Sequence, residues 1–348
     1  MSLFAYRRAG RDRYVERYGL DFEDLVVGQR FRHRPGVTVS QQDNSDEALD
    51  TLNSAMLHFD AAYAAHTPFA RPLVVSTLTV GRVLGMTAKT FGRRTALLGI
   101  ERIELPRPVF GGDTLYAESE VLALDDGDGP DSGTVELATR GLNGDGDEVA
   151  RLHYRIALPR AGRAAADPPG DAAGPPAEEP RFAAYARDGD VLVERFGLFF
   201  EDCRPGETFV HAPRRTVLLE DAVEHARRSL DHSPRWHELD GERRYEVPPT
   251  YVLAVAATTS TRTFARVVAN LGWYDVELPR PVHAGDTLRA ESQILDARPS
   301  RSRPREGVLV VATHAFDQHG EPVLRFRRHL LVNRSGTAAP YRAAGYAS

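Results

Sequence analysis

The chain has 348 residues, 42% of them hydrophobic and 27% charged, with a formal net charge of −5 at pH 7. This length allows two domains that each bury a core, and the mildly acidic balance argues against a nucleic-acid-binding surface. Cys203 is the only cysteine, which excludes an internal disulfide and a zinc site built from several thiolates. No run of about 18 apolar residues suits a membrane span. The N-terminal residues also lack the apolar stretch of a signal peptide, so we expect a cytoplasmic protein.

One long unit occurs twice in the chain. The sequence PRPVFGGDTLYAES at 106–119 returns as PRPVHAGDTLRAES at 279–292, and VERYGL at 15–20 returns as VERFGL at 193–198. Two copies, each longer than a solenoid repeat, indicate a duplicated domain that can fold as a built-in dimer. Function is then expected where the two copies differ.

A segment poor in apolar residues separates the two copies. Residues 160–180 consist mostly of Ala, Pro, Gly and charged residues, a composition typical of an extended linker. We therefore predict an N-terminal domain at 1–159, a linker at 160–180 and a C-terminal domain at 181–348.

The first copy starts with a polar stretch and a short strand at Thr38-Val39. An irregular segment with several polar residues follows, and an apolar run from Val74 to about Thr90 predicts a helix. Apolar residues that alternate with polar ones predict half-buried strands at 100–105 and 114–122. A further strand is predicted at 135–140.

The second copy repeats this layout. Its short strand is expected at Thr216-Val217, its helix from Tyr251 to about Val268, and a later strand at 308–313. Gly112-Asp113 and Gly285-Asp286 predict the turn before the second long strand of each copy. One long helix followed by about four antiparallel strands predicts an α+β domain whose sheet wraps around a helix on one face.

The strand pair with the pattern P-V-x-x-G-D-T-L-x-x-E-S-x-V resembles the MaoC-like hydratases of the hot-dog fold, over nearly all of both copies. Within that family, the sequences ANLGW at 269–273, GDTLRAES at 285–292 and SRSRP at 300–304 resemble the mesaconyl-CoA (2-methylfumaryl-CoA) hydratases. The resemblance implies tandem hot-dog domains that form a pseudo-dimer. It also implies a carbon–oxygen lyase that adds water to, or removes it from, an α,β-unsaturated acyl thioester.

In the MaoC-like family the reactive segment reads D-x-N-P-[LIV]-H. Residues 53–58 of the first copy read NSAMLH, so His58 falls on the family histidine and Asn53 falls on the aspartate position. The resemblance therefore implies that His58 is the acid/base and that Asn53 positions water or substrate. An amide can hold water but cannot take up its proton, whereas imidazole titrates near neutrality.

The second copy departs from the family pattern at the other position. Asp231 stands on the aspartate position, but Trp236 occupies the histidine position and His237 lies one residue later. Asp231 and His237 are therefore the candidates of the second copy. Neither copy carries the complete family pair.

Hydration of an enoyl thioester builds enolate charge on the thioester oxygen, which needs hydrogen-bond donors. The stretch 71–78 is similar to the family sequence R-P-[IL]-V-H-G-M-L, which places Ser76 on the usual glycine. The backbone N–H groups of Ser76 and Thr77, at the start of the long helix, are the candidate donors. The matching stretch at 248–252 contains two prolines, which favours the first copy as the reactive half.

The copies also differ in the charge of one loop. The loop after the second strand of the second copy contains four arginines, Arg298, Arg301, Arg303 and Arg305. The matching loop of the first copy, 125–131, is acidic. Because guanidinium groups bind phosphates in bidentate fashion, the four arginines are candidates for the phosphates of coenzyme A or of a phosphopantetheine arm. They equally suit an acidic carrier protein or an ordinary solvated loop.

We therefore predict an acyl-thioester hydratase or dehydratase whose first copy does the chemistry and whose second copy binds the thioester. The expected partner is an acyl-CoA or acyl-carrier-protein thioester, with no nucleic acid, membrane or metal, and no cofactor beyond the coenzyme A or phosphopantetheine of the substrate. The sequence leaves open whether the two-domain chain forms a homodimer.

Two alternatives remain. One is a MaoC-like biosynthetic enzyme that uses the same pocket for conjugate addition, isomerisation or cyclisation. The other is a non-catalytic subunit that binds acyl thioesters. His33 and His211 occupy equivalent positions in the two copies, which predicts a shared structural role.

Overall fold

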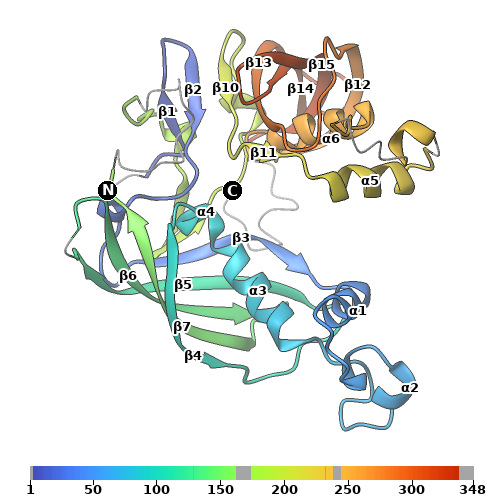
Figure 1. Ribbon diagram of the computed structural model, residues 1–348. Helices are drawn as coiled ribbons and strands as arrows, with labels where there is room; N and C mark the ends of the chain where they lie inside the picture. Colours follow the sequence, from blue (N-terminus) through green and yellow to red (C-terminus); the bar gives the residue numbers. More distant parts are fainter. Residues whose placement is uncertain (1–2, 128, 162–173, 232, 238–243, 337–348) are drawn as a thin grey trace.

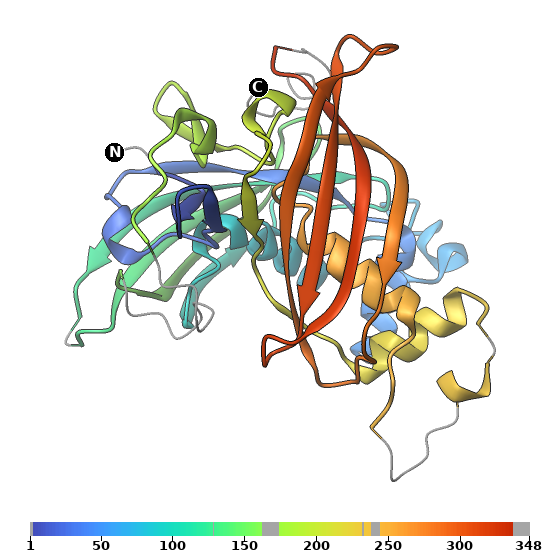
Figure 2. The same cartoon turned by 90° about the horizontal axis from the view of Figure 1, so that it is seen from above.

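The computed structural model describes most of the chain, namely residues 3–127, 129–161, 174–231, 233–237 and 244–336. Each copy contributes a sheet with helices on one face, and the two sheets lie side by side at an angle (Figures 1 and 2). Residues 162–173 of the predicted linker lie outside the described residues, so the domain boundaries stay a prediction. Within the described residues, no helix is both long enough and apolar enough to cross a membrane.

The first sheet has seven strands, in the order β4-β7-β6-β5-β3-β9-β8. They are β3 (Arg30–Thr38), β4 (Ala96–Glu104), β5 (Thr114–Asp125), β6 (Ser132–Leu142), β7 (Glu148–Pro159), β8 (Tyr185–Asp188) and β9 (Val191–Glu194). The helices of this copy are α1 (Gln41–Asp50), α2 (Ala61–Ala64), α3 (Ser76–Met86) and α4 (Ala88–Phe91).

The second sheet has eight strands, in the order β1-β2-β10-β13-β14-β15-β12, with β11 paired to β13. They are β1 (Tyr6–Arg8), β2 (Arg13–Glu16), β10 (Thr208–Val210), β11 (Arg215–Thr216), β12 (Val267–Glu277), β13 (Thr287–Pro299), β14 (Glu306–Phe316) and β15 (Pro322–Asn333). The helices are α5 (Leu219–Arg228) and α6 (Pro249–Thr259).

Period-two burial explains how each sheet packs on its helix. Val135 and Leu137 of β6 are fully buried, whereas Glu136 between them is not. Helix α3 turns Leu78 and Val83 toward the interior, and Val83 joins the same core cluster as Leu137. Burial of these apolar faces drives the sheet and the helix together. The predicted tandem hot-dog architecture, with antiparallel strands around one main helix in each copy, is confirmed.

The predicted helix of the first copy is interrupted, and that of the second copy ends earlier than the sequence predicts. In the first copy the run breaks at Thr87, between α3 and α4. In the second copy α6 stops at Thr259, and Val267 and Val268 belong to β12 instead of the helix. The hydroxyls of Thr258 and Thr259 each donate to the backbone carbonyl three residues earlier, as do the next two residues. Such local bonds compete with helix continuation.

The N-terminal strands of each copy pair with the sheet of the other copy. Strand β2 lies parallel to β10, with Arg13 opposite Thr208, and β9 lies parallel to β3, with Val191 opposite Arg30. The hairpins β1–β2 and β8–β9 are therefore exchanged between the copies. Each sheet is antiparallel among its own strands and contains one parallel junction with the exchanged hairpin.

A buried histidine marks each exchange. Nδ1 of His33 lies 3.0 Å from Oε1 of Glu194, which comes from the other copy, and Nε2 lies 2.8 Å from Oγ of Ser119. Nδ1 of His211 lies 3.3 Å from Oε1 of Glu16, again from the other copy. The predicted structural role of the two histidines is thus confirmed, because both are buried and make equivalent contacts.

Candidate active site

His58 is held in one tautomer by the backbone of the segment before α3. It ends a 3-10 helix, Met56–His58, and its Nδ1 lies 2.7 Å from the carbonyl oxygen of Leu73. A carbonyl oxygen only accepts, so Nδ1 carries the proton when the ring is neutral. The lone pair of Nε2 is then free to accept a proton. His58 is half-buried, so Nε2 is compatible with contact to a small substrate.

Hydrogen bonds of Asn44 connect the loop that contains His58 to the start of α3. Its side chain is fully buried in α1, and its Nδ2 donates to the carbonyl oxygens of His58 at 2.8 Å and Leu73 at 3.0 Å. Its Oδ1 accepts from the N–H of Val75 at 2.8 Å. Sequence reasoning missed this residue. Position-by-position comparison of the copies would have indicated it, because Ala222 occupies the matching position in α5.

The start of α3 presents unused donors. Ser76 and Thr77 are the first two residues of the helix and both are exposed. The first N–H groups of a helix lack intrahelical acceptors, and no acceptor in the described part of the chain receives those of Ser76 and Thr77. The helix dipole adds a partial positive charge at this point. The geometry therefore fits the predicted anion-stabilising role.

A carboxylate that sequence reasoning also missed lies beside these donors. Glu47, in α1, accepts a hydrogen bond from Oγ1 of Thr77 at 3.0 Å. The second copy has the same contact with different chemistry, because Nε2 of His225 lies 3.0 Å from Oγ1 of Thr250. The interaction between the first helix and the start of the main helix is thus conserved between the copies, but only the first copy has a carboxylate there.

Asn53 takes part in the loop that leads to His58. Its backbone N–H donates to the carbonyl of Ala48 at 2.7 Å, and its Oδ1 accepts from the N–H of Ala55 at 3.0 Å. No hydrogen bond of the amide nitrogen occurs among the described residues, so this nitrogen can donate to water. No hydrogen bond within the described residues joins Asn53 directly to His58.

A cavity of about 240 Å³ adjoins the first turn of α3. Its walls include Ser76 and Thr79 of the helix and the segment 105–109 that follows β4. The four remaining lining residues are all apolar: Phe69, Leu73, Val74 and Val149. An apolar cavity next to backbone donors suits an acyl group whose carbonyl oxygen points at the helix.

The second-copy candidates are already engaged with their own loop. The carboxylate of Asp231 accepts from the N–H and Oγ of Ser233 and from Nε1 of Trp236. The hydrogen bonds from Ser233, the side-chain one first, lower the pKa of Asp231. His237 is exposed, and its Nε2 lies 2.7 Å from the backbone oxygen of Asp231. The structure brings these residues together in one turn.

The second copy also lacks one of the helix donors. Pro249 is the first residue of α6, at the position that Ser76 occupies in α3. Proline has no backbone N–H, so only Thr250 of the equivalent pair keeps a donor. This asymmetry agrees with a reactive site in the first copy.

The four candidate arginines lie at the tip of the β13–β14 hairpin. Arg298 is near the end of β13, and Arg301, Arg303 and Arg305 lie in the turn before β14; all four are exposed. The 13 residues of β13 separate this tip from the turn near the start of α6, a length of about 40 Å. No hydrogen bond or ion pair among the described residues connects these arginines to the His58 loop.

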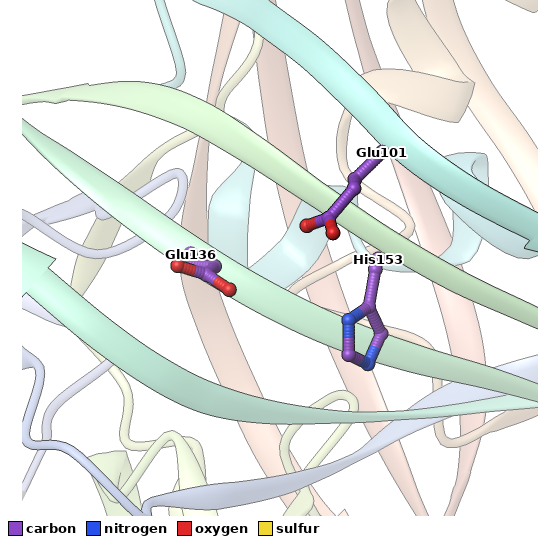
Figure 3. A group of neighbouring side chains, drawn as sticks. All are labelled: Glu101, Glu136 and His153. Atoms are coloured by element: carbon purple, nitrogen blue, oxygen red, sulfur yellow. The ribbon is translucent and has the colours of Figure 1, made fainter.

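A separate group of polar side chains lies on the first sheet. Ligand-type atoms of Glu101, Glu136 and His153, on the neighbouring strands β4, β6 and β7, lie within 4.8 Å of one another (Figure 3). Glu101 is exposed and the other two side chains are half-buried. Water solvates exposed carboxylates well, so their proximity requires no ion. None of the three belongs to the loop around His58.

The chain matches two family models. Residues 23–141 match the family model described as MaoC like domain, and residues 181–342 match the model described as Mesaconyl-CoA hydratase. The mesaconyl-CoA hydratase of Cereibacter sphaeroides is 37% identical over 150 residues, which are 41% of this chain and 43% of that protein. The chain thus spans less than half the length of the first relatives that it matches.

Another relative is matched over more of its length. The (R)-specific enoyl-CoA hydratase of Aeromonas caviae is 34% identical over 99 residues, which are 28% of this chain and 73% of that protein. Among solved structures, a Mycobacterium tuberculosis protein described as having a double hot-dog fold is 22% identical, with a TM-score of 0.37 over 90% of this chain and 98% of that one. From the family models and the relatives in sequence, the chain belongs to the MaoC-like family of hydratases and dehydratases.

Proposed function

We propose that the chain adds water to, or removes it from, an α,β-unsaturated acyl thioester of the coenzyme A type, and that the first copy carries the reaction. The observation that supports this most is the placement of His58. Its Nδ1 is bound to the carbonyl of Leu73, and that residue lies three positions before the exposed donors at the start of α3. One short segment of the chain thus orients the base, His58, and supplies the donors for the negative charge of the enolate oxygen.

In the hydration direction, Nε2 of His58 takes a proton from water while the water oxygen bonds to the β-carbon of the substrate. The electron pair of the carbon–carbon double bond moves toward the thioester carbonyl, whose oxygen becomes an enolate oxygen. The N–H groups of Ser76 and Thr77 and the dipole of α3 stabilise that charge.

The second half-step returns the proton. The imidazolium of His58 donates its Nε2 proton to the α-carbon, the enolate collapses to the thioester, and the histidine becomes neutral again. One residue thus serves both half-steps, because its Nδ1–H stays bound to the carbonyl of Leu73 throughout. Dehydration follows the same path in reverse.

Asn53 is proposed to hold the attacking water. Its amide nitrogen donates to the water oxygen but takes no proton. The family aspartate would share the proton transfers, so its replacement leaves both of them to His58. This change also supports a second function, in which the same pocket polarises an enoyl thioester for conjugate addition or isomerisation instead of hydration.

The second copy is proposed to bind the thioester. Its exposed arginines Arg301 and Arg303 are suited to phosphate oxygens, and its own reactive positions hold Trp236 and Pro249. Phosphates of coenzyme A and those of a phosphopantetheine arm share this chemistry.

An assay with crotonyl-CoA and mesaconyl-CoA tests the proposal. We expect reversible loss of enoyl absorbance with the wild type, and a decrease in kcat of about 10²-fold or more in His58→Ala. His237→Ala, in the second copy, is the matched control and should keep its activity. Equal activity of wild type and His58→Ala would refute the assigned base. Activity on neither substrate, with both thioesters still bound, would favour the second function.

A further inference from the structure

A basic cleft lies between the two copies, at the C-terminal end of α3. Its volume is about 460 Å³, which is within the range of small-molecule sites. No described aspartate or glutamate lines it, but four cationic side chains do: Arg34, Arg82, Lys89 and Arg262. Arg262 belongs to the second copy and the other three belong to the first. A cleft with cations from both copies and no acidic wall attracts an anion.

The centre of this cleft is built by matching positions of the two copies. Lys89 and Arg262 occupy the same place in the duplicated unit, and so do Tyr18 and Phe196. The ammonium of Lys89 lies 5.3 Å from the ring centre of Phe196, and the guanidinium of Arg262 lies 4.6 Å from that of Tyr18. Each cation thus lies over an aromatic ring of the other copy, an arrangement that holds both positive charges at the cleft.

Part of this positive charge lacks a partner. Nη1 of Arg262 and Nε of Arg82 are buried, and neither has a hydrogen-bond acceptor among the described residues. The ammonium of Lys89 donates to the carbonyl of Arg195, which carries no charge. Burial and the charge of Arg262, against the opposite effect of Glu194, lower the pKa of Lys89 to about 8. An anion in the cleft would supply acceptors and favour the charged form of the lysine.

The carboxylates near these cations do not fill the cleft. Glu194 and Glu16 interact electrostatically with Lys89 and Arg262, respectively. Each of them lies against a buried histidine and accepts from a backbone N–H group, and neither lines the cleft. An aspartate in α1 lies 3.6 Å from Nη2 of Arg82, but the two side chains are 39% and 41% exposed, so water weakens this pair.

The first copy also contributes a glycine surface that the second copy lacks. Gly81 and Gly85 lie four residues apart on one face of α3, and both line the cleft. A Cβ at either position would meet no atom within 4 Å, so packing of the described chain does not require glycine there. Ala254 and Thr258 occupy these positions in α6. Glycine is a poor helix former, and a ligand that approaches the helix backbone closely explains its use.

We propose that this cleft binds a phosphorylated small molecule, with a phosphate group between Arg82, Lys89 and Arg262 and its organic part against the glycines of α3. A phosphate monoester carries about two negative charges at pH 7, and guanidinium groups bind it in bidentate fashion. Four cations suit such a dianion better than a single carboxylate. The cleft shares no lining residue with the cavity at the first turn of α3, so its ligand is not the acyl group. The proposal does not depend on the proposed reaction.

Calorimetric titration of the full chain with inorganic pyrophosphate is the first test. We expect saturable binding to the wild type, and an affinity that is about tenfold or more weaker in Arg82→Gln and in Arg262→Gln, because each loses a charge-assisted bond. The double variant Arg301→Ala, Arg303→Ala removes two exposed arginines elsewhere and is the matched control, which should keep the wild-type affinity. No binding to the wild type, or an equal loss in the control, would overturn the proposal.

Gly85→Leu separates binding from folding. Its side chain would occupy the cleft without a change in charge, and leucine is a better helix former than glycine, so the melting temperature without ligand should not fall. Pyrophosphate should raise the melting temperature of the wild type, because it binds the folded state, but not that of this variant. Gly144→Leu, in a turn where a Cβ also has free space, should keep the full rise. An equal rise in Gly85→Leu would place the ligand elsewhere.

A titration with coenzyme A distinguishes a separate ligand from the phosphates of the proposed substrate. Arg262→Gln should bind coenzyme A as the wild type does while its affinity for pyrophosphate falls. A loss of both affinities in this variant would assign the cleft to the thioester and would overturn a ligand of its own.

Discussion

Glu194 of the second copy lies 3.0 Å from Nδ1 of His33 in the first copy, and both side chains are fully excluded from solvent. Oε2 of Glu194 accepts from the backbone N–H of Arg34 at 2.9 Å, and Oε1 accepts from Oγ1 of Thr90 at 2.7 Å. One carboxylate thus satisfies several buried donors of the other half. The pair formed by Glu16 and His211 repeats the arrangement in the opposite direction.

We expect Glu194→Ala to lower the free energy of unfolding by about 3–5 kcal/mol, because removal of one partner leaves His33 and its neighbours buried without their acceptor. Asp190→Ala is the control in the same hairpin. Asp190 is 78% exposed and 3.3 Å from Arg30, and loss of such a surface pair costs less than about 1 kcal/mol. Denaturant unfolding of both variants measures the difference. Similar losses in the two variants would contradict the role assigned to Glu194.

The carboxylate of Glu194 should make the stability of the protein depend on pH. Burial alone would raise the pKa of Glu194, but the charge of His33 and its hydrogen bond, with Lys89 and Thr90, hold that pKa below its usual value. A carboxylate with a lowered pKa contributes stability above the pKa of the unfolded chain and loses it as the pH falls through the folded pKa. We therefore expect the melting temperature to fall as pH drops below the usual glutamate range. Glu194→Gln should show a shallower fall over that window, and parallel curves would argue against the linkage.

Asn44→Ala tests the support of His58. The variant gives α1 the residue that α5 has, and it leaves the carbonyls of His58 and Leu73 and the N–H of Val75 without this partner. We expect a loss of stability of about 1–3 kcal/mol, and a decrease in kcat that exceeds any change in KM. Gln42→Ala, on the exposed side of the same helix, is the control. Wild-type kcat in Asn44→Ala would show that the histidine keeps its orientation without this residue.

The arginine loop should affect binding and not chemistry. In the double variant Arg301→Ala, Arg303→Ala we expect KM for a coenzyme A thioester to rise about tenfold or more, with kcat unchanged, since each charge-assisted bond to phosphate contributes about 1.5–3 kcal/mol. A pantetheine thioester without phosphates is the matched substrate control and should show no change. An equal rise in KM for both substrates would assign the effect to something other than phosphate.

The fold was accessible from the sequence because it depends on local periodicity and on the repeat. Alternation in β5 and the turn at Gly112-Asp113, where Gly112 has φ of +101°, are as predicted. The hairpin exchange was not accessible, because the short strands RYVE at 13–16 and VLVE at 191–194 suit pairing with either sheet. Only the folded chain shows that β2 pairs with β10 and that β9 pairs with β3.

The candidate site was accessible in part for a related reason. His58, Asn53 and Ser76 are candidates because their spacing matches the motifs of the MaoC-like family. Asn44 and Glu47 carry no motif, since their importance arises from contacts with residues 14 to 31 positions away that only the folded chain brings together. The exposure of β4, where Leu97 and Leu98 are 48% and 47% exposed, was also hidden, because an alternating pattern cannot tell whether an edge strand is covered.

The exchanged hairpins also affect how such a chain can change during evolution. Once each half supplies the carboxylate that another half needs in its interior, a gene that encodes one half alone would specify a protein with an unsatisfied histidine at its centre. The two halves must then be transmitted as one reading frame or as two that are always made together. A change at Glu194 in the second copy would remove the acceptor that His33 and Arg34 of the first copy need.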